Sequence, residues 1–238
     1  MAFWFSRRRP LVEIPRLRPR GHVAPGARVN LAELVPDLLP YLGQAAYLQL
    51  DAFESFARVV TAVPSLAAKE KVTLAAAKAS SKYQGLVAEI RRHDGDPVTV
   101  MLPFSASVGR FQRVTGGVDW REDLLGAYVT GGLLDDFFIR LAEGLPRESG
   151  SRISQLLGAD GGQAGVIQVL QDAIAADSRL ASRLALWGRR LVGDTLLVAR
   201  GALHLSENPA SDQQRIEPVL TELIAAHTRR MDTLGLTA

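Results

Sequence analysis

The sequence KEKVTLAAAKASSKYQGLVAEIRRH, residues 69–93, reads as one long helix. Neither proline nor glycine interrupts it before Gly85. The side chains of residues 75–81 are unusually small, which lets neighbouring helices approach closely. The stretch therefore predicts one helix of a helix bundle, with a core face that includes Ser81 and Gln84. Its buried stripe has the 3.6-residue period of an amphipathic helix and consists of Ala76, Ser80, Tyr83, Val87 and Ile90.

Capping and turn signals divide the rest of the chain into further helices. Ser65 follows Val63-Pro64 and can cap the helix above, and Asp119 with Glu122 has the spacing of a capping box. No strand-like alternation of useful length occurs, so the predicted fold class is all-α. The helices are expected at about 37–61, 65–93, 105–113, 120–143, 147–176, 178–205 and 213–234. The helix at 147–176 is expected to be interrupted at 158–162. Asn30 and Glu33 have the spacing of a capping box and predict an earlier helix start before the first of these.

The helix expected at 178–205 carries an acidic residue on its apolar stripe. Leucines and a tryptophan recur there with alternating steps of four and three, and Asp194 falls in the same series. A carboxylate in such a place is expected to form an ion pair with a nearby arginine. An arginine such as Arg190 is the expected partner.

Composition excludes several classes of function. The chain of 238 residues has no cysteine, which rules out disulfides, zinc–thiolate sites and thiol nucleophiles. No apolar run approaches the roughly 20 residues of a membrane span, and the N-terminal sequence does not have the order of a secretory signal. We therefore expect a cytoplasmic protein.

The first 29 residues differ from the rest of the chain. Residues 1–28 hold seven arginines and one glutamate, a net charge of +6, whereas the whole chain has +3. Prolines are frequent, so an extended or disordered arm (1–29) is expected before a helical domain (30–238). The arm could contact RNA or another anionic partner, pack its aromatics on the protein's own body, or dock on a membrane surface. The candidate nucleic-acid contacts are Arg7, Arg8, Arg9, Arg16, Arg18 and Arg20.

The layout of the long helices raises the question of a metal centre. Four long helices with one long crossover, here residues 97–118, are typical of di-iron carboxylate bundles. Those bundles supply a Glu-x-x-His motif from two helices, because that spacing puts both ligands on one face. None of the histidines fits, since Pro19, Ile90, Gly201 and Ile224 precede His22, His93, His204 and His227 by three residues.

Two C-terminal strings carry a family resemblance. SRLALWGRRLVGDTLLVAR (182–200) and ELIAAHTRRMDTLGL (222–236) resemble bacterial ferritin-like proteins grouped with the tRNA hydroxylase that acts on 2-methylthio-isopentenyladenosine, the MiaE-like proteins. The likeness extends from about Leu39 to the C-terminus. It implies a ferritin-like four-helix bundle with two additional C-terminal helices.

The same resemblance implies that the metal ligands are replaced. LQLDAFE (48–54) matches a family string GELTAFE, and KASSKYQG (78–85) matches AAAEFGHF. YVTGG (128–132) and GQAGV (162–166) match strings like YVGDG and GHAEF. On this alignment Gln49, Ser81 and Gly165 stand where the family has glutamate, Gln84 and Gln163 where it has histidine, and Gly131 where it has aspartate.

These replacements determine the expected function. Amides and hydroxyls bind iron poorly where carboxylate and imidazole are needed, so no metal or other cofactor is expected. We expect a non-catalytic binding or scaffold protein, RNA-associated through its arm and able to form a homodimer. The alternative is an iron-dependent, di-iron tRNA hydroxylase-type oxygenase that uses other carboxylates, of which Glu54, Asp135 and Asp136 lie near these strings. Otherwise Glu54 and Asp136 are expected to form ion pairs within the bundle.

Overall fold

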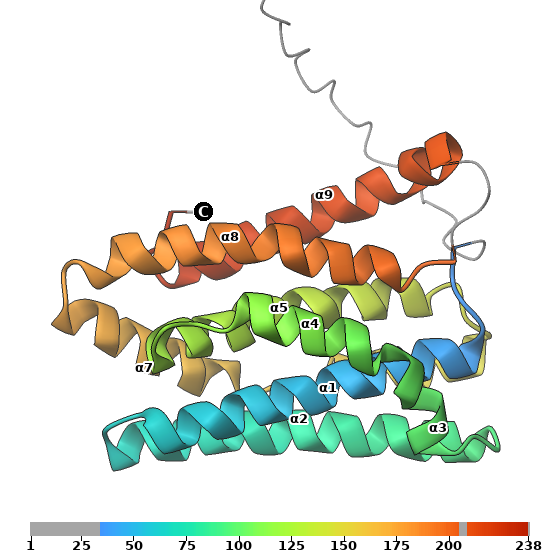
Figure 1. The fold of residues 1–238 in the computed structure, drawn as a ribbon, viewed down its shortest axis with the longest axis horizontal. Coiled ribbons are helices and arrows are strands. Elements are labelled where there is room, and N and C mark those ends of the chain that lie inside the picture. Colours follow the sequence, from blue (N-terminus) through green and yellow to red (C-terminus); the bar gives the residue numbers. More distant parts are fainter. Residues whose placement is uncertain (1–33, 205–208, 238) are drawn as a thin grey trace, which may run out of the picture.

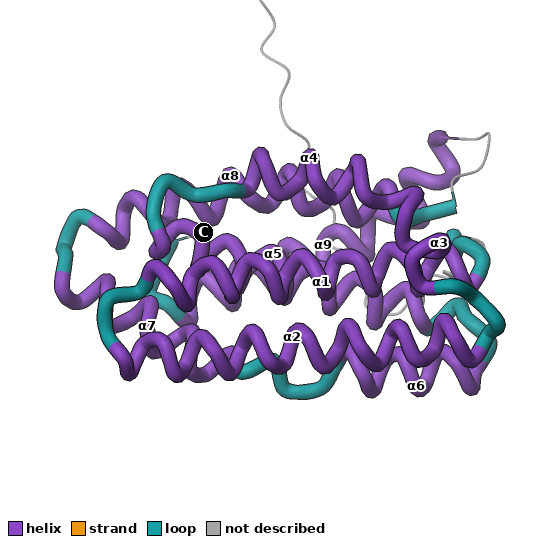
Figure 2. Tube along the Cα trace, turned by 60° about the horizontal axis from the view of Figure 1, so that its bottom comes forward, coloured by secondary structure: helices purple, strands orange, loops and turns teal. Residues whose placement is uncertain are grey.

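The structure is a computed structural model that describes residues 34–204 and 209–237. Within these ranges every regular element is a helix, which confirms the all-α prediction (Figure 2). No helix there is long and apolar enough to cross a membrane. The predicted arm and the predicted helix start at Asn30 lie outside the described residues.

A four-helix bundle forms the body of the molecule. The helices α1 (Leu38–Ala62) and α2 (Leu66–Arg92) run antiparallel along their whole length (Figure 1). The third helix, α5 (Trp120–Ala142), packs on α1. The fourth position is shared by α6 (Arg147–Leu157) and α7 (Gln163–Ala176), which both pack on α2 and α5.

The helix starts are set by the predicted capping residues. Ser65 accepts a hydrogen bond from the backbone N–H of Ala68 at the start of α2, with an N–O distance of 3.1 Å. The Asp119 carboxylate accepts from the N–H groups of Arg121 and Glu122 at 2.9 and 3.2 Å. Such side chains satisfy donors that have no partner inside the helix. The sequence therefore locates both starts correctly.

The break between α6 and α7 lets the chain approach α2 closely. Gly162 has a φ of 71°, in the left-handed region that favours glycine. A Cβ added there would lie 3.2 Å from the Cα of Ala75, one of the small residues of α2. The predicted interruption of the fourth helix is thus confirmed, and the small side chains of α2 make room for it.

The remaining helices cover α1 and α5. The crossover predicted with one short helix contains α3 (Pro97–Met101), a 3-10 turn (Leu102–Phe104) and α4 (Ser105–Thr115). The two C-terminal helices are α8 (Leu180–Gly201) and α9 (Pro209–Thr233), and both pack on α5 (Figure 1). This confirms the predicted four-helix bundle with two additional helices at its C-terminus.

The predicted ion pair on α8 is wrong. Asp194 is only half-buried, and the core position beside it belongs to Thr195, which is 1% exposed. The Arg190 guanidinium instead lies over the Trp187 ring, 5.2 Å from its centroid. Among the described residues Asp194 has neither an ion pair nor a hydrogen bond to its carboxylate. The buried stripe continues from Leu191 by steps of four, so the prediction missed it by one residue.

The predicted core face of α2 also needs correction. Ser81 and Gln84 are exposed; the Ser81 hydroxyl donates to the Ala77 carbonyl, and the Gln84 amide donates to Ser80. The predicted stripe is confirmed in part: Ala76, Val87 and Ile90 are buried, whereas Ser80 and Tyr83 are only partly buried. The buried face is wider than that stripe and also includes Val72, Ala75, Ala79, Lys82 and Leu86, which follow steps of three and four.

Candidate functional site

A small polar group lies in the middle of the bundle. Its members are Gln49 from α1, Lys82 from α2 and Asp135 from α5. The Lys82 ammonium is 2.6 Å from one Asp135 oxygen, and the Gln49 amide nitrogen donates to the other at 2.6 Å. Lys82 also donates to the carbonyl of Leu157, at the end of α6, at 2.6 Å. One lysine thus joins three helices.

The environment of this group is apolar. Two clusters of buried hydrophobic residues fill the bundle, and the group lies between them: Leu48 and Leu86 belong to one cluster, Phe56 and Ala79 to the other. The Lys82 side chain is 7% exposed and that of Asp135 14%. Burial raises the pKa of the Asp135 carboxyl, while the Lys82 ammonium and then the Gln49 amide act to lower it.

A small cavity adjoins the three side chains. Its volume is about 50 Å³, and its apolar wall is built largely of alanine and glycine. A cavity of this size holds a few water molecules, whereas a dry cavity that binds benzene measures about 150 Å³. The centre of the bundle therefore has room for water but not for an organic substrate.

The predicted ligand positions are only partly brought together. Gln49, Gly131 and Gln163 all line this cavity. Ser81 and Gln84 point away from it, as described above. Gly165 lies where α7 meets α2, since a Cβ there would be 3.1 Å from the Cβ of Lys71.

The residues present do not fit a di-iron centre. Such a centre needs several carboxylates and two histidines from four helices. The cavity is lined by one carboxylate, Asp135, and by no histidine. That carboxylate is already bonded to an ammonium group. Across residues 34–204 and 209–237 no group of three or more histidine, aspartate and glutamate side chains could hold a metal ion.

The other two carboxylates named from the sequence have different surroundings. Asp136 pairs with Arg230 of α9 at 2.8 Å, which confirms the predicted ion pairing. Glu54 is exposed and accepts a hydrogen bond from the Gln112 amide at 3.3 Å, so its predicted ion pair is not formed within the part of the chain described. Neither carboxylate lines the central cavity.

Sequence reasoning missed Lys82, although a signal for it was present. The residues at 72, 75, 79, 82 and 86 alternate steps of three and four, and lysine is the one charged member of that stripe. A charge is rarely buried without a partner, so this position predicts a buried acid opposite it. The arginines predicted to contact nucleic acid, from Arg7 to Arg20, lie outside the described residues, and that contact stays a prediction.

Comparison with known proteins identifies a family to which the chain is similar. A family described as a ferritin-like domain of actinomycetes matches residues 30–205, about three quarters of the chain. The matched segment covers the four-helix bundle and α8. Comparison with curated proteins finds no match.

Proposed function

This chain belongs to the actinomycete ferritin-like domain family, and we propose that it is a ferritin-like bundle without a metal centre that acts as a non-catalytic binding or scaffold protein. The ion pair of Lys82 and Asp135 carries the proposal. In a di-iron bundle the metal ions supply the positive charge that balances buried carboxylates. Here the ammonium of Lys82 supplies that charge to the single carboxylate of the cavity.

The small cavity supports a binding role on the surface rather than a reaction in the core. An oxygenase needs an open space beside its metal for substrate, and about 50 Å³ beside Lys82 does not provide it. The resemblance to MiaE-like proteins suggests the alternative, a tRNA hydroxylase-type oxygenase. That alternative requires iron ligands other than those at the centre of the bundle.

A cytoplasmic location, which the lack of cysteine favours, is part of the proposal.

Metal content is the direct test of this proposal. The full chain is loaded anaerobically with ferrous iron, desalted and analysed by mass spectrometry of the metal. We expect far less than one iron per chain, because the cavity offers one carboxylate that is already paired. Circular dichroism of the same sample checks that the helices remain folded. A content of about two irons per chain, the stoichiometry of a di-iron site, would overturn the proposal and favour the oxygenase.

The proposal also names partners for the chain: RNA, bound through residues 1–28, and a second copy of the chain in a homodimer. The net charge of +6 in residues 1–28 favours RNA, because arginines that neutralise phosphates release counterions. We expect deletion of residues 1–28 to abolish RNA binding and its salt dependence, as measured by fluorescence anisotropy of a labelled oligoribonucleotide at several salt concentrations. Unchanged affinity after the deletion would remove the arm from this role.

A further inference from the structure

A surface groove between α4 and α8 is larger than the central cavity. Its volume is about 340 Å³, and its apolar lining includes Phe104, Phe111, Val114, Leu197 and Val198. Leu197 is 68% exposed and Val114 39% exposed, so large apolar side chains face solvent on both helices. These apolar side chains are gathered in one groove instead of being scattered singly over the surface, and singly scattered ones would need no explanation. We call this the α4–α8 groove.

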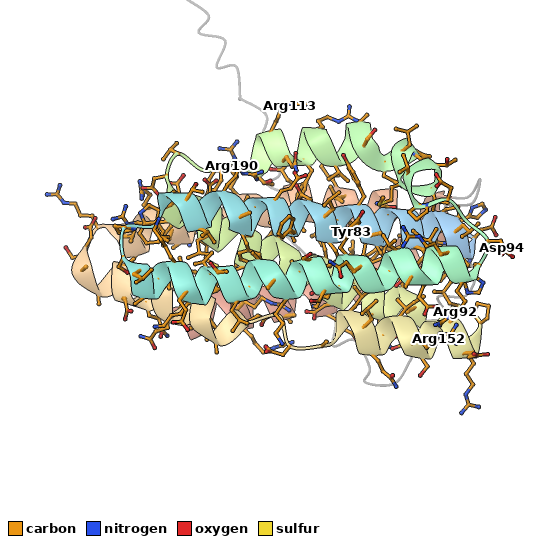
Figure 3. All side chains as sticks on the ribbon, turned by 90° about the horizontal axis from the view of Figure 1, so that it is seen from below. Tyr83, Arg92, Asp94, Arg113, Arg152 and Arg190 are labelled. Carbon is orange, nitrogen blue, oxygen red and sulfur yellow. The ribbon has the colours of Figure 1, made fainter. Side chains whose placement is uncertain are left out.

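The borders of the α4–α8 groove are basic. Arg110 lines it, and Arg113 lies three residues further along the same side of α4. Arg190 lies one turn before Asp194, which is a lining residue of α8. Arg113 and Arg190 are found on the same side of the bundle (Figure 3). Within the described ranges none of these three arginines forms an ion pair, and Asp194 is the one carboxylate in the lining.

The charge decides which occupant fits. A second copy placed on the same face by two-fold symmetry would set these arginines against their own copies. The chain's own arm has a net charge of +6 and would be repelled in the same way. A single-stranded nucleic acid would gain from the arginines, but the groove offers its bases little stacking surface, since Phe111 is 4% exposed and Phe104 is only partly exposed, and phosphates gain nothing from the apolar floor. An acidic amphipathic helix satisfies both the basic border and the apolar floor.

We propose that the α4–α8 groove binds an acidic amphipathic helix of another protein. Apolar side chains at positions i, i+3, i+4 and i+7 of that helix would lie along Val114, Leu197 and Val198, as in other helix-in-groove complexes. Its glutamates or aspartates would face Arg110, Arg113 and Arg190. The acidic helix is thus a partner for the proposed binding function, and the inference rests on that function. It does not depend on whether the centre of the bundle binds metal.

A synthetic peptide of about 18 residues can test the groove. It has leucine at the spacing above and glutamate elsewhere, and a control peptide has lysine in place of glutamate. On titration into the ¹⁵N-labelled full chain, we expect amide shifts confined to residues 104–115 and 190–201, and affinity that falls with added salt. The lysine peptide is expected to leave these signals unchanged.

Matched substitutions locate the binding. Leu197→Ser should weaken peptide affinity about tenfold by removing apolar contact. Leu74→Ser, at a 50% exposed leucine on α2 away from the groove, should not. Likewise Arg113→Glu should weaken peptide affinity, and Arg147→Glu on α6 should leave it unchanged.

Three results would each overturn the proposal. They are equal binding of the lysine peptide, amide shifts spread over other helices, and groove signals of the free protein that change with protein concentration. Metal content tests the proposed function separately.

Discussion

Substitution of Lys82 by methionine is expected to lower the free energy of unfolding by about 3–5 kcal/mol at pH 7.5, as measured by urea denaturation. Methionine keeps most of the volume of the lysine stem and removes only the ammonium. The Asp135 carboxylate then loses its partner at 2.6 Å inside an apolar surrounding. The Leu157 carbonyl also loses its donor. Leaving a buried charge alone costs far more than the intact pair contributes.

Two further variants separate this charge effect from a packing effect. Lys82→Met combined with Asp135→Asn removes both charges and leaves an acceptor for the Gln49 amide, so it should recover more than half of the lost stability. Lys78→Met breaks a pair with Asp160 at 3.8 Å one turn earlier on α2, where the side chains are 41% and 73% exposed. That loss should stay below about 1 kcal/mol. Equal losses for Lys78→Met and Lys82→Met would contradict a special role for Lys82.

Asp51→Asn is expected to stabilise the protein at neutral pH and to leave it unchanged near pH 4. Burial raises the pKa of the Asp51 carboxyl to about 6, while the Gln112 side chain and then Arg58 oppose the shift and Glu54 adds to it. One carboxylate oxygen is buried and has no hydrogen-bond partner among the described residues. The folded state therefore binds more protons than the unfolded state between about pH 4 and 6. Stability falls as pH rises through that window, and the loss is complete above it.

The measurement is urea denaturation of both proteins at pH 4, 5, 6 and 7.5. Asparagine cannot ionise, so the variant should gain about 1–2 kcal/mol over the parent at pH 7.5, less than the full shift implies because the side chain is partly exposed. Asp96→Asn is the control, because it should lower stability at neutral pH where Asp51→Asn raises it. Thr99 donates to the Asp96 carboxylate from its backbone and hydroxyl and keeps that pKa below its ordinary value. A constant difference between Asp51→Asn and its parent at all pH values would refute the titration.

Much of the fold follows from local sequence signals. Ser65 and Asp119 locate helix starts because their side chains satisfy backbone donors within three residues, so no tertiary information is needed. Gly162 marks the break of the fourth helix for an equally local reason, its positive φ. The buried face of α2 is predictable only in part, because its alanines and serines are too alike in polarity to show how far the buried face extends around the helix.

The site was predictable only in part. Gln49 was found by resemblance and does lie at the centre of the bundle. Lys82 is not identified by that resemblance, because the resemblance concerns the positions of the metal ligands and Lys82 is not one of them. Its partner Asp135 was noted as a surviving carboxylate, yet nothing local in the sequence links residues 53 positions apart. Their pairing follows from how α2 packs against α5, which is a property of the assembled bundle.

The hydrogen bond from Lys82 to Leu157 has a consequence for how the bundle responds to its surroundings. A dissociable ion stabilises a protein by an amount that depends on its free concentration. The ammonium that joins α2, α5 and the end of α6 is covalently attached and cannot dissociate. Under the proposed function, the three helices are therefore expected to be held in the same way when iron is scarce, when it is abundant and when a chelator is present.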